Sequence, residues 1–208
     1  MLYEVSGDIL LSRAQAIAHG VAPNDGHNQG LAHSLRASWP AMYKDFRHFC
    51  QTTHPKTGAM WAWAGAEGAR VVSLFTQDAA YDHGAKPGRA SAENLNHALK
   101  ALRKWVDTEG VTSLALPRLA TGVGGMNWDE VRPLIEKHLG DLSIPVYVYV
   151  TYRQGEQASV GATPDLDQAK VRCPALGERL QAGHPDQRRL ELLKKHVVRH
   201  PCFVDFDP

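Results

Sequence analysis

The feature that most constrains the fold is a glycine-rich turn at residues 118–128, which joins a short apolar run to an amphipathic segment. The run, residues 111–116, is rich in β-branched and apolar side chains, as in a buried strand. Asn127 and Glu130 follow at the spacing of a capping box, which marks a helix start. Apolar residues and a histidine then recur at helical spacing, at Val131, Leu134, Ile135 and His138. The order of strand, turn and helix predicts an α/β unit.

Three glycines suit this turn to phosphate binding. Gly122, Gly124 and Gly125 can adopt positive φ angles and carry no Cβ atom. Successive backbone N–H groups can therefore converge on a phosphate close to the N-terminus of the next helix. An ordinary turn between a strand and a helix would use the same residues, so the turn alone leaves both interpretations open.

The chain up to residue 152 alternates between segments with strand-like and helix-like patterns. Besides residues 111–116, the predicted strands are residues 2–5, 15–19, 58–65, 70–76 and 144–151. The predicted helices are residues 31–38, 41–50, the segment after Asn127, and 91–108 with Ser91 as its cap. This alternation predicts a three-layer α/β/α fold, with helices on both faces of a central mixed sheet.

Composition excludes several classes of protein. The 208 residues suffice for one domain of about 150 residues and an extension. With 23 basic and 22 acidic residues, the chain has no global charge for strong non-specific nucleic-acid or membrane binding. Its three cysteines are far apart, which argues against a disulfide framework or a metal site. Without a signal-like N-terminus or a long apolar segment, we expect a cytoplasmic monomer that needs no cofactor.

In sheets of this kind, ligands bind beyond the carboxyl ends of the strands, and the first such loop holds Gly7, Asp8 and Ile9. The Asp8 carboxylate can accept a hydrogen bond from the exocyclic amine of adenine. The N–H group of Ile9 can donate to a ring nitrogen of the same base. A helix cap or a turn would also explain Asp8.

Two further loops at this edge are polar. Residues 22–31 are rich in Asn, Asp, His and Gly and can wrap a polyhydroxyl ligand, or form a solvated loop. Residues 75–78 end a buried strand, and the long loop after them can close as a lid or be merely flexible. That loop holds Tyr81, Asp82, His83, Lys86 and Arg89.

Taken together, these segments resemble a macrodomain over roughly residues 1–152. The resemblance is carried by the Gly-Asp-Ile start, the Ala-His-Gly strand before residues 22–31, the Trp-Pro-x-Met-Tyr helix pair and Leu-Pro-Arg-Leu-Ala-Thr-Gly-Val-Gly-Gly-Met-Asn-Trp. The sequence is most similar to terminal ADP-ribose glycohydrolases and to antitoxin macrodomains that remove ADP-ribose from DNA. The resemblance implies that ADP-ribose, or a macromolecule modified with it, is the ligand.

The resemblance also assigns the ligand contacts. Asp8 and Ile9 would hold the adenine, and Tyr152 would stack on it or simply cover the sheet end. The diphosphate would lie between the glycine turn and the loop before Leu31, with the distal ribose near Asn24. The implied ligand-binding residues are Asp8, Ile9, Asn24, Gly30, Leu31, Gln77, Thr121, Gly122, Val123, Gly124, Gly125, Met126 and Tyr152.

Catalysis is where the sequence departs from this branch. Members of that branch use a lysine immediately after the threonine that ends the buried strand. In this chain that position is Gln77. A glutamine can form no Schiff base and cannot act as a general base. Some members have an aspartate in the glycine turn, where this chain has Gly124. Lys86 could replace the lysine only by swinging in from the loop. The candidates to orient or deprotonate a water are Asp25, His27 and His83.

Three functions are therefore open. We predict a hydrolase that releases ADP-ribose from a modified macromolecule or removes phosphate from ADP-ribose 1″-phosphate. The alternative is a non-catalytic reader of ADP-ribose, which the glutamine and the glycine favour. A nucleic-acid or partner-binding protein with an incidental pocket is the weakest reading, because no basic stripe interleaved with aromatic residues is present.

Residues 153–208 lie outside the resemblance and form a C-terminal extension. Within it, residues 185–200 have the pattern of one helix with an apolar side and several basic residues. We expect this helix to pack on the domain. Its basic face could alternatively contact a phosphate-bearing substrate or partner.

Overall fold

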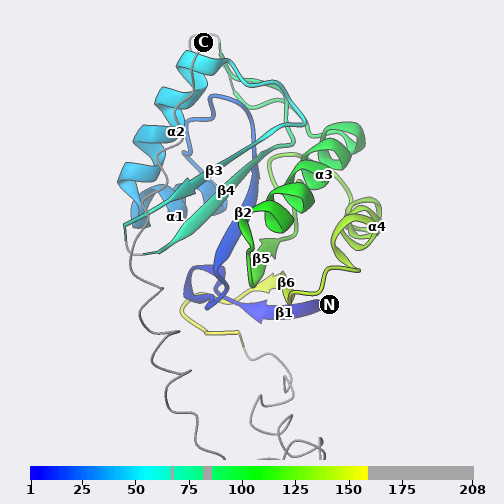
Figure 1. The fold of residues 1–208 in the computed structure, drawn as a ribbon. Coiled ribbons are helices and arrows are strands. Elements are labelled where there is room, and N and C mark those ends of the chain that lie inside the picture. The colour runs from blue at the N-terminus through cyan, green and yellow to red at the C-terminus, as the bar shows by residue number, and fades with distance from the viewer. Residues whose placement is uncertain (67, 82–85, 159–208) are drawn as a thin grey trace, which may run out of the picture. The chain divides into compact units, whose positions relative to one another are not determined.

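The computed structural model describes residues 1–66, 68–81 and 86–158, and there strands and helices alternate as predicted (Figure 1). The strands are β1 (Leu2–Gly7), β2 (Ala16–Val21), β3 (Met60–Ala64), β4 (Arg70–Phe75), β5 (Leu114–Pro117) and β6 (Val146–Tyr152). The helices are α1 (Gly30–Ser38), α2 (Pro40–Thr53), α3 (Ala92–Glu109) and α4 (Trp128–Leu139), with a short 3-10 helix η1 (Ile9–Leu11).

The strands form one mixed sheet in the order β1-β6-β5-β2-β4-β3. Neighbouring strands are parallel except β3, which runs antiparallel to β4 at the edge. The carboxyl ends of β1, β2, β4 and β5 therefore meet at the same edge of the sheet. The loops expected to bind ligand all leave from this edge.

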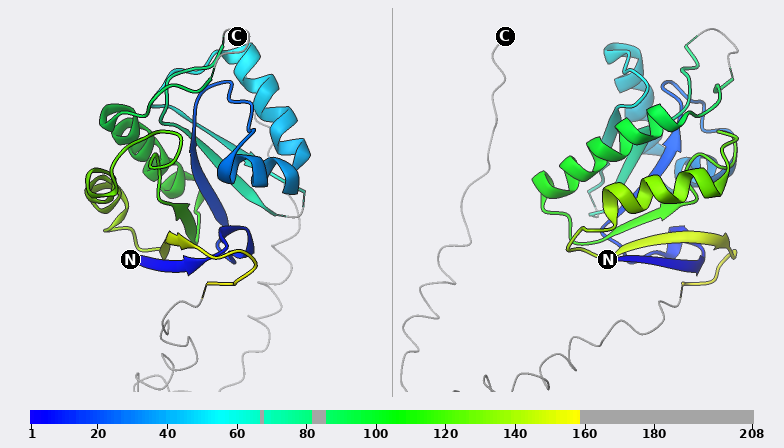
Figure 2. Two further views of the ribbon diagram at one scale, coloured as in Figure 1. Left: turned by 180° about the vertical axis from the view of Figure 1, so that it is seen from behind. Right: turned by 90° about the vertical axis from the view of Figure 1, so that its right-hand side faces the viewer.

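Helices cover both faces of the sheet (Figure 2). Helices α3 and α4 pack on one face and α1 and α2 on the other, and each face has its own hydrophobic core. The buried stripe of α3, on the face that it shares with α4, consists of Leu95, Ala98, Leu99, Leu102 and Val106. This arrangement confirms the predicted three-layer α/β/α fold.

The two predicted helix caps have different outcomes. Ser91 caps α3 as expected, since its Oγ accepts a hydrogen bond of 3.1 Å from the N–H of Asn94. The capping box at Asn127 is wrong, because the Asn127 side chain makes no capping hydrogen bond. Its backbone carbonyl instead accepts from the N–H groups of Glu130 at 3.1 Å and Val131 at 3.2 Å. Helix α4 thus begins where predicted, but through the backbone.

The chain that follows β6 folds back over the end of β1. The N–H of Arg153 donates to the Gly7 carbonyl at 3.1 Å, and the N–H of Asp8 donates to the Glu156 carbonyl at 2.7 Å. A Cβ atom on Gly7 would lie only 2.8 Å from the Ala158 nitrogen, so this approach needs glycine. The predicted helix at residues 185–200 lies outside the described residues. No helix in the described part of the chain is long and apolar enough to cross a membrane.

Candidate functional site

The glycine turn after β5 presents backbone N–H groups at the carboxyl edge of the sheet. It is held in shape by hydrogen bonds from Gly125 N to Gly122 O at 3.1 Å and from Met126 N to Ala120 O at 3.0 Å. The N–H groups of Gly122, Val123 and Gly124 donate to no backbone carbonyl of any described residue. These three residues line a cavity of about 190 Å³. The turn therefore has the free donors that a phosphate cradle requires.

Space inside the turn is limited at Gly124. A Cβ atom there would lie 2.6 Å from the Ala120 carbonyl oxygen and 2.8 Å from the Ala90 Cβ. The Gly124 carbonyl also accepts a hydrogen bond of 3.0 Å from Ala90 N, which joins the turn to the segment before α3. A side chain at this position would require the turn to shift.

Asp8 acts as a cap and also lines a second cavity. Its Oδ1 accepts a hydrogen bond of 3.1 Å from Leu10 N at the start of η1, and its Oδ2 accepts one of 3.1 Å from Gly155 N. The cap interpretation of this residue is therefore confirmed. The adjoining cavity, of about 390 Å³, is largely apolar. Its lining includes Asp8, Ile9, Gly30, Leu31, Tyr149 and Tyr152, and the Tyr152 side chain is 68% exposed.

Gln77 and His19 also line the cavity under the glycine turn. Gln77 is only 4% exposed, and its Oε1 has no hydrogen-bond partner among the described residues. His19 is also buried and contacts Ser73, with 3.2 Å between His19 Nε2 and Ser73 Oγ. Burial keeps the pKa of His19 well below its usual value, so this ring is neutral near pH 7.

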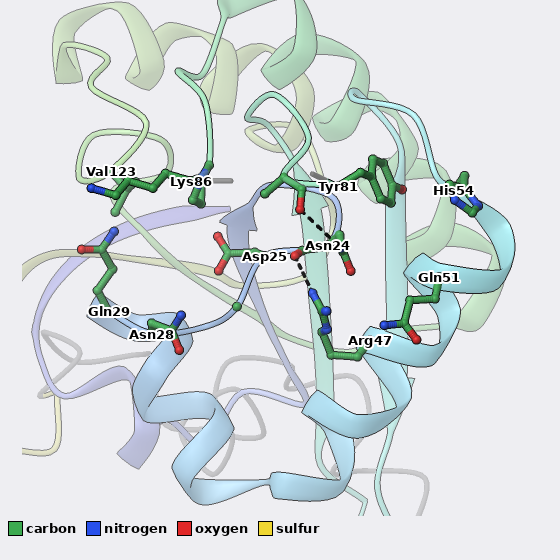
Figure 3. Close-up of a pocket in the computed structure, with 13 residues that line it drawn as sticks. Asn24, Asp25, Asn28, Gln29, Arg47, Gln51, His54, Tyr81, Lys86 and Val123 are labelled. Atoms are coloured by element: carbon green, nitrogen blue, oxygen red, sulfur yellow. Dashed lines mark hydrogen bonds between the residues drawn. The ribbon is translucent and has the colours of Figure 1, made fainter. Parts of the chain in front are cut away.

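The loop after β2 forms the wall of a third, outer cavity of about 850 Å³ (Figure 3). Asn24 has a positive φ of 61° and is held by two hydrogen bonds. Its Nδ2 donates to the Ala80 carbonyl at 3.1 Å, and its own carbonyl accepts from Arg47 Nη1 at 2.7 Å. Asp25 follows it, and its Oδ1 accepts a hydrogen bond of 2.6 Å from His27 N. Burial raises the pKa of Asp25, while backbone hydrogen bonds with His27 and Ala22 and the charge of Arg47 oppose the rise.

Of the three predicted catalytic residues, Asp25 lines the groove, whereas the ring of His27 does not. Asp25 lines both the cavity under the turn and the outer cavity. The His27 ring is instead fully buried against α2, with its centroid 4.6 Å from that of Phe46 and 5.2 Å from that of Tyr43. Burial, with smaller effects from Arg36 and Arg47, lowers the pKa of His27 to about 4. His83 lies outside the described residues, and the neighbouring Lys86 lines the outer cavity.

The three cavities follow one another along the sheet edge. The apolar cavity and the cavity under the turn share Gly30, Leu31 and Pro117 in their linings. The cavity under the turn and the outer cavity share Asp25, Gln29 and Val123. Together they make one groove with an apolar end, a middle rich in N–H donors and a polar end. No group of three or more His, Cys, Asp or Glu residues in the described ranges is arranged to hold a metal ion.

Several lining residues of the outer cavity were not predicted from the sequence. Arg47, Gln51 and His54 come from α2 and its C-terminal cap, and the His54 ring stacks on Tyr81 with 5.0 Å between centroids. In the sequence these residues resemble the solvated face of any amphipathic helix. Their role depends on how α2 lies against the loop after β2, which no local pattern encodes.

Comparison with known proteins identifies the family of this chain. Residues 26–135 match the family profile of the Macro domain. Two relatives are 27% identical to this chain: a "DNA ADP-ribosyl transferase-DNA ADP-ribosyl glycohydrolase fusion protein" of Thermosipho africanus over 158 residues, and a "DNA ADP-ribosyl glycohydrolase" of Thermus aquaticus over 150 residues. The matches cover 70% and 72% of this chain but only 41% of each relative. The chain thus spans less than half the length of these relatives.

Solved structures share the fold. The macrodomain of Thermus aquaticus DarG superposes with a TM-score of 0.64 at 25% identity, covering 72% of this chain and 98% of that chain. Thermosipho africanus DarTG in complex with ADP-ribose superposes with the same TM-score at 23% identity, covering 75% of this chain and 42% of that chain. The family match spans more than half of the 208 residues, and the fold and the groove are consistent with it. The chain belongs to the Macro domain family.

Proposed function

We propose that this macrodomain binds ADP-ribose along the groove and hydrolyses the bond at C1″ of its distal ribose when another group is attached there. The observation that carries the proposal is the continuity of the groove around the glycine turn. The free N–H groups of Gly122, Val123 and Gly124 lie in its middle, where a diphosphate would sit between a base and a ribose.

The apolar cavity suits adenine. A purine has apolar faces and a polar edge, and the lining of this cavity includes Tyr149, Tyr152 and the carboxylate of Asp8. Each Asp8 oxygen accepts one backbone hydrogen bond and retains acceptor capacity for the exocyclic amine. Capping η1 and holding adenine are therefore compatible roles for this carboxylate.

Hydrolysis at the polar end of the groove, away from the apolar cavity, would depend on Asp25. It is the only carboxylate among the described residues that line the middle and outer cavities. An ionised Asp25 could accept a proton from a water that attacks C1″. Holding the water and the ribose in the correct geometry would supply much of the remaining rate, which requires little of any single side chain.

The relatives support hydrolysis of ADP-ribose from a macromolecule, since both are named as DNA ADP-ribosyl glycohydrolases. A DNA-linked substrate is accordingly one candidate for this chain. Two observations favour a non-catalytic reader as the second candidate function. Gln77 offers no nucleophile where it lines the middle of the groove, and Gly124 leaves no room for a side chain in the turn.

Binding is tested by calorimetric titration with ADP-ribose. Asp8→Ala should weaken binding by about tenfold or more, because the exocyclic amine of adenine loses a negatively charged hydrogen-bond acceptor. Asp107→Ala is the matched control, since it removes an exposed carboxylate on α3. Unchanged affinity of the Asp8 variant, with circular dichroism showing an intact fold, would mean that adenine lies elsewhere.

Turnover is tested by incubation with ADP-ribose 1″-phosphate, ADP-ribosylated protein and ADP-ribosylated DNA, followed by detection of released ADP-ribose. We expect release from at least one substrate and a loss of about 100-fold or more in Asp25→Asn. Asparagine keeps an oxygen for the hydrogen bond from His27 N, so the loop should hold its shape. Tight binding of ADP-ribose without release from any substrate would establish the reader instead.

A further inference from the structure

The two ends of the glycine turn, Arg118 and Trp128, contact each other, and the proposed ADP-ribose site uses neither of them. The guanidinium carbon of Arg118 lies over the ring of Trp128, 5.3 Å from its centroid. This distance is within the range of a cation–π interaction, which extends to about 6 Å. Arg118 directly follows β5, and Trp128 is the first residue of α4. The contact therefore closes the turn that carries the free N–H groups.

Each partner of this contact is restrained by its surroundings. Trp128 is half-buried and packs against the hydrophobic core that α3 and α4 share. Thr121 Oγ1 donates a hydrogen bond of 2.9 Å to the backbone carbonyl of Arg118. An arginine held on an aromatic ring has fewer conformations to lose on ligand binding than a freely solvated one. Arg118 is thus exposed to solvent but already restricted in its conformation.

Arg118 also supplies the positive charge of the cavity under the turn. Among the described residues that line this cavity, it is the only Arg or Lys, and Asp25 is the only carboxylate. In the described part of the chain, no Asp or Glu oxygen lies within 4.0 Å of its nitrogens. Its guanidinium fork is therefore not occupied by a carboxylate, and the geometry of this fork matches the oxygens of a phosphate.

A diphosphate in this cavity would need more than backbone N–H groups. Both of its phosphate groups are ionised near pH 7, whereas each N–H group carries only a partial positive charge. The first turn of α4 holds Asp129 and Glu130, whose negative charges would oppose the ligand. A full positive charge beside the turn would offset this repulsion, and Arg118 can supply it.

We propose that Arg118 binds the diphosphate of ADP-ribose together with the N–H groups of the turn, and that Trp128 is a positioning residue that holds the guanidinium for this contact. The inference rests on the proposed function and adds two residues to its ligand site. It also assigns a use to both ends of residues 118–128, since a plain turn between a strand and a helix needs neither an arginine nor a tryptophan.

Calorimetric titration with ADP-ribose tests the charge of Arg118. Arg118→Gln should bind about tenfold more weakly than the intact protein at about 50 mM NaCl, because a hydrogen bond between charged groups is lost. At about 500 mM NaCl the difference should shrink to about threefold, since salt screens an exposed pair of charges. Arg118→Lys should lie between the two, because it keeps the charge without the fork. Arg132→Gln is the matched control, because it removes an exposed cation of α4 that pairs with Glu4 and Glu136.

A double-mutant cycle tests the role of Trp128. Trp128→Leu should weaken ADP-ribose binding by about threefold in the intact protein but have no further effect in Arg118→Gln, because Trp128 acts through Arg118. Trp128→Phe keeps an aromatic face and should bind within about twofold of the intact protein. Circular dichroism checks the fold of each variant. An equal loss in both backgrounds would show that Trp128 only supports the turn.

The results separate this inference from the underlying function. If the intact protein does not bind ADP-ribose, the proposed function fails and the inference fails with it. If ADP-ribose binds and the affinity of Arg118→Gln is within about twofold of the intact protein, only the role of Arg118 is overturned. A loss of equal size at both salt concentrations would also overturn it, because a contact between charges must weaken with salt. Arg118→Gln leaves the core untouched, so this test does not depend on how well Trp128→Leu folds.

Discussion

Gln77 is buried in a way that a bound ligand would explain. Its side chain is 4% exposed, and its Oε1 finds no donor among the described residues. A buried acceptor without a donor costs about 1–3 kcal/mol. A hydroxyl group of the distal ribose is the kind of donor that would remove this cost, since Gln77 lines the cavity under the glycine turn.

Replacement of Gln77 by methionine should therefore affect stability and binding in opposite directions. The variant keeps a similar volume without the unpaired oxygen, so the Tm of the ligand-free protein should rise. Affinity for ADP-ribose should fall by about fivefold, which corresponds to one lost hydrogen bond. Scanning calorimetry and titration measure the two effects, with Gln154→Met as an exposed control. A lower Tm with unchanged affinity would mean that Gln77 is structural.

His27 should make the protein sensitive to acid. Its pKa is about 4 in the folded state, below the value of about 6.5 in an unfolded chain. The unfolded state binds the extra proton between these values, so the stabilising contribution is present above pH 6.5 and is lost as pH falls toward 4. The loss amounts to about 3 kcal/mol. His27→Phe should lose less free energy of unfolding than the intact protein in urea titrations between pH 7 and pH 4.5. Equal losses would show that His27 is not the group responsible.

At the scale of elements, the glycine turn distinguishes two neighbouring glycines. A Cβ atom at Gly124 would collide with Ala120 and Ala90, whereas one at Gly122 would meet no atom within 4 Å. Gly124→Ala should therefore displace the N–H groups of the turn and weaken ADP-ribose binding by about tenfold or more. Gly122→Ala should bind within about threefold of the intact protein. Titration of both variants decides the point, and equal affinities would show that the turn does not hold the diphosphate.

Elements were more predictable than side-chain positions. Periodicity indicated the six strands and four α-helices of the described residues, but not the short helix η1. The Asn127 capping box failed because the spacing of two residues does not fix which atom accepts the hydrogen bond. His27 was predicted beside the ligand, but at a φ of 48° its ring is buried against the aromatic side chains of α2. Arg47 gave no local signal at all, because its contact with Asn24 joins two elements.

At the scale of the whole domain, the groove is a product of sheet topology. Asp8, Asp25, Gln77 and Gly124 follow four different strands, and the parallel strand order brings their loops to one edge. The segment after β6 is a fifth part of the chain at this edge. Its Gly155 N–H donates to Asp8 Oδ2, and its Glu156 carbonyl accepts from Asp8 N. A ligand that spans the groove would therefore connect loops from most of the domain and stabilise the fold as a unit.

Thermal unfolding with and without ADP-ribose tests the central claim most directly. A ligand at about 100 times its dissociation constant stabilises the native state by about 2.7 kcal/mol. For a domain of this size that corresponds to a rise in Tm of about 5–10 °C. We predict a rise of this size that saturates with ADP-ribose concentration. An unchanged Tm at millimolar ADP-ribose, with circular dichroism showing a folded protein, would contradict ADP-ribose binding and the function built on it.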